Sequence, residues 1–193
     1  QLNINSDNNI YEGTFSIDAG ASLINALTFD FEGNSIENNG YINIDALTLS
    51  GNTPQTILGT GAIENLTINN PTGVTLVGAA EFQTINNSLT FVNGNLITGG
   101  NKISITDGAL VSGASAVSYV YGNMEYDFNV TEPFTYTIGD ASNYTPLTLT
   151  PTITTAGKIR ARTDAGDHPD ISNSVINPAK SVNRIWSLQD DGV

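Results

Sequence analysis

A short sequence word returns four times in the first half of the chain, at intervals that few folds produce. The word is an apolar residue, a threonine and a second apolar residue, and its copies are spaced 20, 19 and 23 residues apart. The copies are Leu27-Thr28-Phe29, Leu47-Thr48-Leu49, Leu66-Thr67-Ile68 and Leu89-Thr90-Phe91. Because repeats of this length made of β-type residues fold as units that stack on one another, the word predicts a solenoid.

Each repeat also holds two further apolar clusters, so each turn of the solenoid should contain three strands. In the second repeat these clusters are Ile57-Leu58 and Ile63, and in the fourth they are Leu96-Ile97 and Ile103 with Ile105. Glycine and asparagine, which tolerate the positive φ of sharp corners, separate the clusters. We therefore expect an all-β fold that begins with a three-faced parallel β-solenoid of ~20-residue rungs. Asparagines at equivalent corners could stack into hydrogen-bonded ladders.

The first residues of the chain continue this pattern less regularly. Leu2-Asn3-Ile4 and Phe15-Ser16-Ile17-Asp18 have the composition of strands, and we expect them to form one further rung. An uncapped solenoid end exposes unpaired strand edges, which favours self-association through the solenoid ends. No basic and apolar leader stands at the start, and we expect the chain to be a piece of a longer protein.

The distribution of charge marks a boundary in the second half. The net charge is −13; up to residue 157 a single basic residue, Lys102, stands against 14 acidic ones, whereas five basic and five acidic residues follow. Short aromatic strands separated by prolines begin near residue 119, a pattern typical of an antiparallel sandwich. We expect β-solenoid repeats over residues 1–118 and, over residues 119–193, an antiparallel β-sandwich-like domain that packs on the solenoid end and is truncated at its C-terminal end.

Composition argues against several classes of function. Nucleic-acid binding needs clustered lysine and arginine, and anionic membranes repel an acidic chain, so neither partner is expected. No apolar run reaches the ~20 residues that span a bilayer, so membrane insertion is not expected. Cysteine is absent, which excludes disulfides, thiolate metal sites and a cysteine nucleophile. An acidic, lysine-poor chain rich in asparagine and threonine is compatible with a bacterial cell surface.

Catalytic chemistry has little support in the sequence. His168 is the only histidine, it lies in a turn-like segment, and no nucleophile-elbow motif is present. Asp30 and Glu32 share one strand face, and paired carboxylates cleave polysaccharides on some solenoid folds. Two acids on a water-facing strand are more often solvated surface, so we expect no enzyme activity and keep a polysaccharide-active enzyme or accessory module as the alternative.

The threonines of the repeated word are the first set of candidate binding residues. Since their apolar neighbours point inward, these side chains should point outward in a row with a spacing of about 4.8 Å, as in ice-binding solenoids. The row would consist of Thr28, Thr48, Thr67 and Thr90. Ice-binding faces use paired threonines, however, so we favour simple strand propensity as the explanation of a single row.

Two further sets lie in the second half. Five tyrosines could stack on sugar rings, although tyrosines of a sandwich more often pack in its core or at its edges. They are Tyr119, Tyr121, Tyr126, Tyr136 and Tyr144. Three aspartates within seven residues, Asp164, Asp167 and Asp170, could supply oxygen ligands to calcium, although their spacing matches no known calcium loop and also fits a solvated turn.

Several phrases resemble those of large repetitive surface proteins of Bacteroidota that the type IX secretion system exports. In the solenoid these phrases are Glu64-Asn65-Leu66-Thr67-Ile68-Asn69-Asn70 with Gly73-Val74-Thr75-Leu76, and Ser88-Leu89-Thr90-Phe91 with Asn93-Gly94-Asn95-Leu96. Tyr119-Val120-Tyr121-Gly122-Asn123-Met124 is similar to the family's transition out of the repeats. Phe134 with Ile138-Gly139, Tyr144-Thr145-Pro146-Leu147-Thr148-Leu149 and Asn183-Arg184-Ile185-Trp186-Ser187-Leu188 are similar to its following β domain.

The resemblance implies an extracellular or outer-surface protein, often an adhesin, with no agreed catalytic residues. The family's C-terminal sorting domain is not found after Val193. Together with the residue patterns, the resemblance predicts a non-enzymatic stalk that binds surface glycans or other cell-surface components. The alternatives are the polysaccharide-active module and, third, an ice-binding solenoid.

Overall fold

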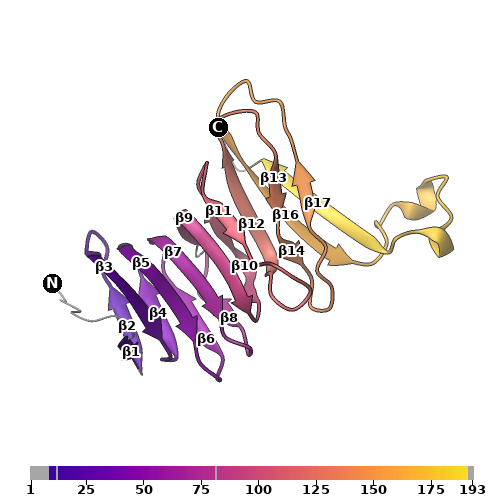
Figure 1. Cartoon of the computed structure of the whole chain (residues 1–193). Helices are drawn as coiled ribbons and strands as arrows, with labels where there is room; N and C mark the ends of the chain where they lie inside the picture. The colour runs from indigo at the N-terminus through magenta and orange to yellow at the C-terminus, as the bar shows by residue number, and fades with distance from the viewer. Residues whose placement is uncertain (1–8, 12, 81, 191–193) are drawn as a thin grey trace.

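The structure is almost entirely β and has the shape of a stacked coil that ends in an antiparallel hairpin (Figure 1). It is a computed structural model, and it describes residues 9–11, 13–80 and 82–190. Strand accounts for 59% and helix for 3%, in a parallel β-solenoid of about six turns. The fold class predicted for the first part is therefore confirmed. The expected strand at Leu2-Asn3-Ile4 lies outside the described residues.

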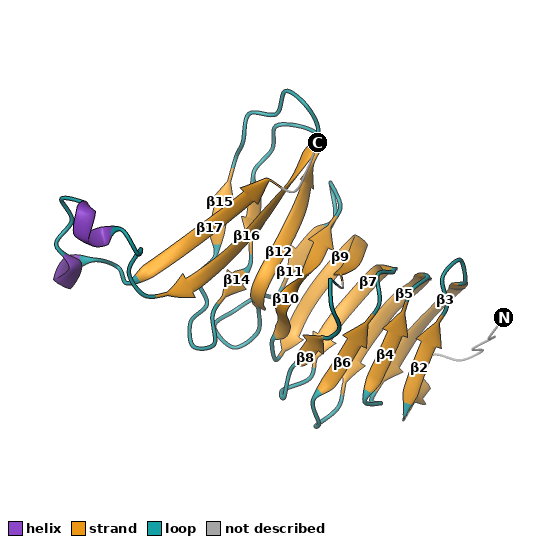
Figure 2. Cartoon of the chain, turned by 180° about the vertical axis from the view of Figure 1, so that it is seen from behind, coloured by secondary structure: helices purple, strands orange, loops and turns teal. Residues whose placement is uncertain are grey.

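Three parallel ladders of strands build the coil (Figure 2). The first ladder contains β2 (Thr14–Ile17), β4 (Ser35–Asn38), β6 (Gln55–Leu58), β8 (Val74–Leu76) and the first residues of β10 (Leu96–Ile105) and β12 (Val120–Phe128). The second ladder contains the first halves of β3 (Ser22–Phe31), β5 (Tyr41–Ser50), β7 (Ala62–Asn69) and β9 (Phe82–Asn93), with the second halves of β10 and β12. The second halves of β3, β5, β7 and β9 form the third ladder, between β1 (Asn9–Tyr11) and β11 (Leu110–Ser112).

Stacks of inward-facing apolar side chains fill the coil. In the third ladder one stack is Phe29, Leu47, Leu66, Leu89 and Val111, in register from strand to strand. All of these side chains except Val111 are buried. Because every rung covers the apolar side chains of the previous one, the core runs the length of the coil, as expected for a solenoid.

The first copy of the repeated word is displaced in this register. Phe29, not Leu27, pairs with Leu47, and Thr28 pairs with Ala46. Leu27, Phe29 and Phe31 are all buried, so a shift of two residues keeps every side chain on its own face. Thr28 therefore does not belong to the predicted threonine row, and Asp30 takes the place beside Thr48.

Buried amide side chains, rather than simple asparagine ladders, hold the corners between rungs. The Gln83 amide donates to the carbonyl oxygens of Asn38, Leu58 and Gly59 at 3.1, 3.3 and 2.7 Å. The Asn38 amide donates to Gln83 Oε1 at 2.8 Å, and Asn70 donates to Gln55 Oε1 at 2.9 Å. At Gly59 a Cβ atom would lie 2.3 Å from the Asn38 carbonyl oxygen, so this close approach requires glycine. The asparagines of the repeat thus satisfy buried backbone groups at sharp corners.

The parallel coil continues past residue 118 and then changes to antiparallel pairing. β12 pairs in parallel with β10, which places it on the last turn, and β14 (Ile138–Gly139) extends the first ladder beyond it. The second half of β12 pairs antiparallel with β16 (Gly157–Ala165), and β16 pairs antiparallel with β17 (Arg184–Asp190). A separate antiparallel pair consists of β13 (Phe134–Tyr136) and β15 (Leu147–Leu149). The ladders therefore cross the boundary expected between residues 118 and 119.

Ion pairs join this antiparallel part to the coil. Glu125, whose side chain is 1% exposed, forms a salt bridge with Lys102 from the preceding rung and accepts a hydrogen bond from Ser104 at 2.9 Å. Lys158 of β16 lies 3.7 Å from Glu125 and 3.1 Å from Asp127. The change of charge along the sequence thus partly reflects pairing across this junction, since a buried carboxylate needs cationic partners.

The segment between β16 and β17 projects away from the coil (Figure 1). It contains two short 3-10 helices, η1 (Ile171–Asn173) and η2 (Pro178–Lys180), and neither has a buried residue. Within the described residues, no helix is long and apolar enough to span a bilayer.

A second ion pair gives the antiparallel part a pH dependence. Burial alone would raise the pKa of Asp140, but backbone N–H groups of Ser142 and Asn143 and the Arg184 guanidinium, 2.7 Å from Oδ2, lower it below the ordinary 3.8. A carboxyl group whose pKa is lower in the folded protein than in the unfolded chain stabilises the fold in full at pH values above its unfolded pKa. This contribution is lost as the pH falls through the lower pKa of the folded protein. We expect Asp140→Asn to lose about 1–3 kcal/mol at neutral pH.

Urea unfolding of wild type and Asp140→Asn at several pH values measures this contribution. The stability difference between the two proteins should shrink as the pH falls below about 4, because Asp140 itself takes up a proton in wild type, whereas the other carboxylates titrate in both proteins and cancel. A difference that stays constant down to about pH 2 would contradict the assignment to Asp140.

Candidate functional site

The outward threonine row is present but short. Thr48, Thr67 and Thr90 pair in register on the third ladder, followed by Ser112. The three side chains are half-buried, and Thr90 Oγ1 lies 3.4 Å from Ser112 Oγ. Asp30, rather than Thr28, lies beside Thr48 on the neighbouring strand. The row therefore consists of three threonines, one from each strand.

Three of the five candidate tyrosines are core residues. The hydroxyl of Tyr119 donates to the carbonyl oxygen of Asp140 at 2.6 Å, and that of Tyr136 donates to the carbonyl oxygen of Ile159 at 2.8 Å. Both side chains and Tyr126 are buried, so they have no free ring face for a sugar, and the expectation of sugar stacking does not hold for them. Tyr121 and Tyr144 remain partly exposed.

The three candidate calcium ligands do not converge. Both carboxylate oxygens of Asp164 accept hydrogen bonds from Arg162, and Asp170 Oδ2 lies 3.9 Å from His168 Nδ1. Asp167 is half-buried in the turn after β16. No group of three acidic or histidine side chains with metal-binding geometry occurs in the part of the chain that the structure describes. The predicted calcium site is therefore not formed by this geometry.

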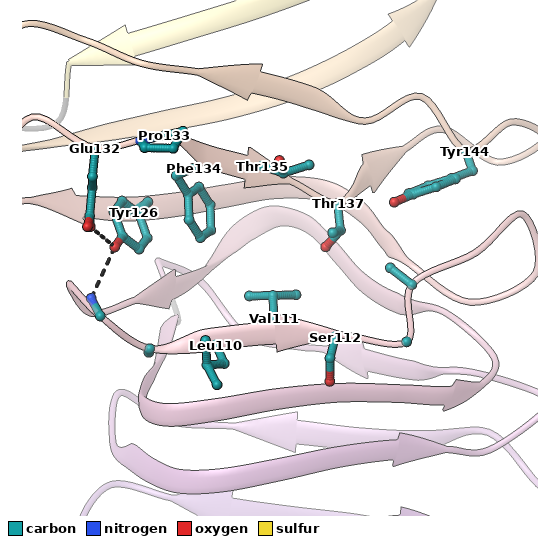
Figure 3. A pocket seen from close by; sticks show the side chains of 14 residues that line it. Leu110, Val111, Ser112, Tyr126, Glu132, Pro133, Phe134, Thr135, Thr137 and Tyr144 are labelled. Carbon is teal, nitrogen blue, oxygen red and sulfur yellow. Dashed lines mark hydrogen bonds between the residues drawn. The ribbon is translucent and has the colours of Figure 1, made fainter.

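A cleft that the sequence did not reveal lies where the third ladder ends (Figure 3). Its volume is about 460 Å³. The strand β11 lies along one side, and Pro133, Phe134 and Thr135 lie along the other. Val111 and Phe134 point into the space between them, and Tyr144 lies at one end.

Tyr126 closes the opposite end of the cleft. Its hydroxyl accepts a hydrogen bond from the Gly108 N–H at 3.0 Å and donates one to Glu132 Oε1 at 2.5 Å. Burial and the hydrogen bond to Glu132 raise the pKa of Tyr126, so the hydroxyl stays protonated. The ring stacks on that of Phe134, with centroids 3.8 Å apart. These contacts make this end of the cleft rigid. It is also acidic, because Glu132 is the one charged residue among those that line the cleft.

Sequence reasoning missed the cleft because its components look unremarkable along the chain. The segment between β10 and β12 contains only the three-residue strand β11. Phe134 is one of several aromatic residues in the second half of the sequence, and no pattern distinguishes it. The available signal was the absence of a further Leu-Thr word at the expected step after Leu89. Comparison of the chain with protein-family models, with curated proteins and with solved structures gave no match.

Proposed function

We propose that this chain is a non-enzymatic, extracellular segment of a large bacterial surface protein, which acts as a stiff stalk. The observation that carries the proposal is the parallel pairing of the three ladders, which continues from rung to rung, with one apolar core that runs through them. A coil of this kind is stabilised rung by rung by nearest-neighbour contacts and therefore resists bending and extension. The surface location and the adhesin role, as in the type IX-secreted proteins of Bacteroidota, rest on the resemblance of the sequence.

The acidic exterior supports a role that involves binding neither to nucleic acids nor to anionic membranes. A strongly negative net charge keeps copies of a long rod soluble and mutually repelling. We propose surface glycans or other cell-surface components as partners, and we keep pairing through the solenoid ends as a second mode of assembly.

We further propose that the last part of the chain is sandwich-like. Tyr126 and Phe128 of β12 pack against Phe134 of β13, with ring centroids 3.8 and 6.5 Å apart. The β13–β15 pair thus covers one face of the β12–β16 sheet, as in a two-layer arrangement.

A cleavage assay separates the stalk from the polysaccharide-active alternative. We expect incubation with an acidic polymer, polygalacturonate, and a neutral one, amylose, to leave the chain length of both unchanged by size-exclusion chromatography. In parallel, binding of the protein to both polymers is measured on a biosensor that carries them immobilised. Binding without cleavage agrees with an adhesive segment. Shortening of either polymer that disappears in Asp30→Asn, but not in the control Asp45→Asn, would overturn the proposal and assign catalysis to the solenoid face.

A further inference from the structure

The cleft at the end of the third ladder is bordered by two strands that do not pair with each other. Among the described residues β11 pairs with β9 alone, and β13 pairs with β15 alone. Chain order would make β13 the next member of the third ladder, because β12 supplies the first two ladders of that turn and β14 returns to the first. The ladder is therefore open at this step, with β11 on one side of the cleft and β13 on the other.

The apolar core is also left uncovered at this step. Val111 continues the stack of Leu66 and Leu89, yet its side chain is only half-buried. Its neighbour Leu110, in register with Ser88 on the outward face, is 71% exposed. An extended strand beside β11 would supply backbone hydrogen bonds to its edge and one apolar side chain above Val111.

The charge of the cleft indicates which strand would fit. Glu132 lies at the end where β11 begins, because the Tyr126 hydroxyl bonds both to it and to the Gly108 N–H. Asp107 Oδ1 lies 3.3 Å from the same hydroxyl, and no basic residue lines the cleft. A strand parallel to β11 would place its N-terminal end beside these two carboxylates, which attract a cation there.

We propose that this cleft binds an extended peptide strand of another polypeptide, which adds in parallel to β11 and carries a lysine or arginine at its N-terminal end. An apolar residue of that strand covers Val111, and the basic side chain pairs with Glu132. This peptide-binding activity goes beyond the stalk role and does not depend on where the protein resides.

Fluorescence anisotropy with the whole chain tests the proposal. The probe is the peptide Lys-Asn-Leu-Thr-Ile-Asn with a C-terminal fluorophore, which repeats the chain's own third-ladder residues 65–69 after a lysine. A peptide with proline in place of threonine cannot donate that backbone N–H and should bind at least about tenfold more weakly. A peptide with glutamate in place of lysine should bind about threefold more weakly at low salt.

Two variants locate the binding. Glu132→Gln still accepts the hydrogen bond of Tyr126 and should weaken the preference for lysine over glutamate, since only the Asp107 carboxylate then remains at that end. Val111→Trp should fill the cleft and abolish binding. Hydrogen exchange should slow at residues 110–112 when the probe is added, which reports strand addition without any substitution.

Three results would overturn the proposal. One is unchanged anisotropy with the lysine probe up to about 1 mM protein. Another is equal binding of the proline peptide, which would show that no strand is added. The third is displacement of the probe, together with protection of residues 110–112, by the neutral oligosaccharide maltohexaose, which would assign the cleft to a glycan.

Discussion

Leu66→Asp is expected to break the coil in its middle and to lower the melting temperature by about 10 °C or more. Leu66 is 1% exposed and lies between Leu47 and Leu89 in the third-ladder stack. A buried carboxylate without a cationic partner costs about 4 kcal/mol or more, and it also removes the apolar contacts of both neighbouring rungs. Because rungs interact only with their neighbours, the lesion should separate the stability of the two halves.

Hydrogen exchange resolves which half is lost. In Leu66→Asp, the amides of β3, β5 and β7 should lose protection first, whereas those of β12, β16 and β17 should remain protected. Ile24→Asp makes a similar apolar-to-acid change at a side chain that is 67% exposed, and it should melt within a few degrees of wild type. Equal melting temperatures for Leu66→Asp and wild type would contradict the proposed core.

The repeat made the coil predictable because the same residues recur wherever the same packing recurs. An inward apolar position must be apolar in every rung, so the spacing of the Leu-Thr words reports the turn length directly. The exact register is less constrained, because Leu27, Phe29 and Phe31 all fit the inward face. Two registers therefore satisfy the same pattern, and the sequence alone favoured the one that misplaced Thr28.

The second part was harder to predict because its residues have no repeated partners. The tyrosine content of this part suggested an exposed aromatic surface. Each hydroxyl of Tyr119, Tyr126 and Tyr136 instead donates to a carbonyl or carboxylate oxygen, which allows the side chain to be buried. The acceptors on Asp140 and Ile159 lie 21 and 23 residues away along the chain, so no local pattern identifies them.

The cleft illustrates the same limit for the candidate site. It arises because β13 pairs with β15 instead of β11, and that choice of partner depends on the whole antiparallel part. The sequence does show that the regularly spaced Leu-Thr words stop after Leu89, in the strand that pairs with β11 at the end of the third ladder. The open strand edge itself is a property of the three-dimensional pairing.

Gln83→Leu is expected to destabilise the coil by about 2–4 kcal/mol, although leucine is apolar and similar in size. Gln83 is 1% exposed, and its amide holds the carbonyl oxygens of Asn38, Leu58 and Gly59 at one corner. Leucine leaves these acceptors in a site closed to water and deprives the Asn38 amide of its 2.8 Å acceptor. Urea unfolding followed by far-ultraviolet circular dichroism measures the loss.

A double-mutant cycle shows whether the loss comes from the corner network. Because Asn38 and Gln83 bond reciprocally, the effects of Asn38→Leu and Gln83→Leu should fall short of additivity by about 1–3 kcal/mol in the double variant. Asn87→Leu is the control, since its amide donates to Asn65 at 2.6 Å in an exposed position, and it should cost less than about 1 kcal/mol. Additive effects of the two buried substitutions would mean that each acts alone, and that the asparagine and glutamine content of this repeat reflects turn preference rather than a network that joins the rungs.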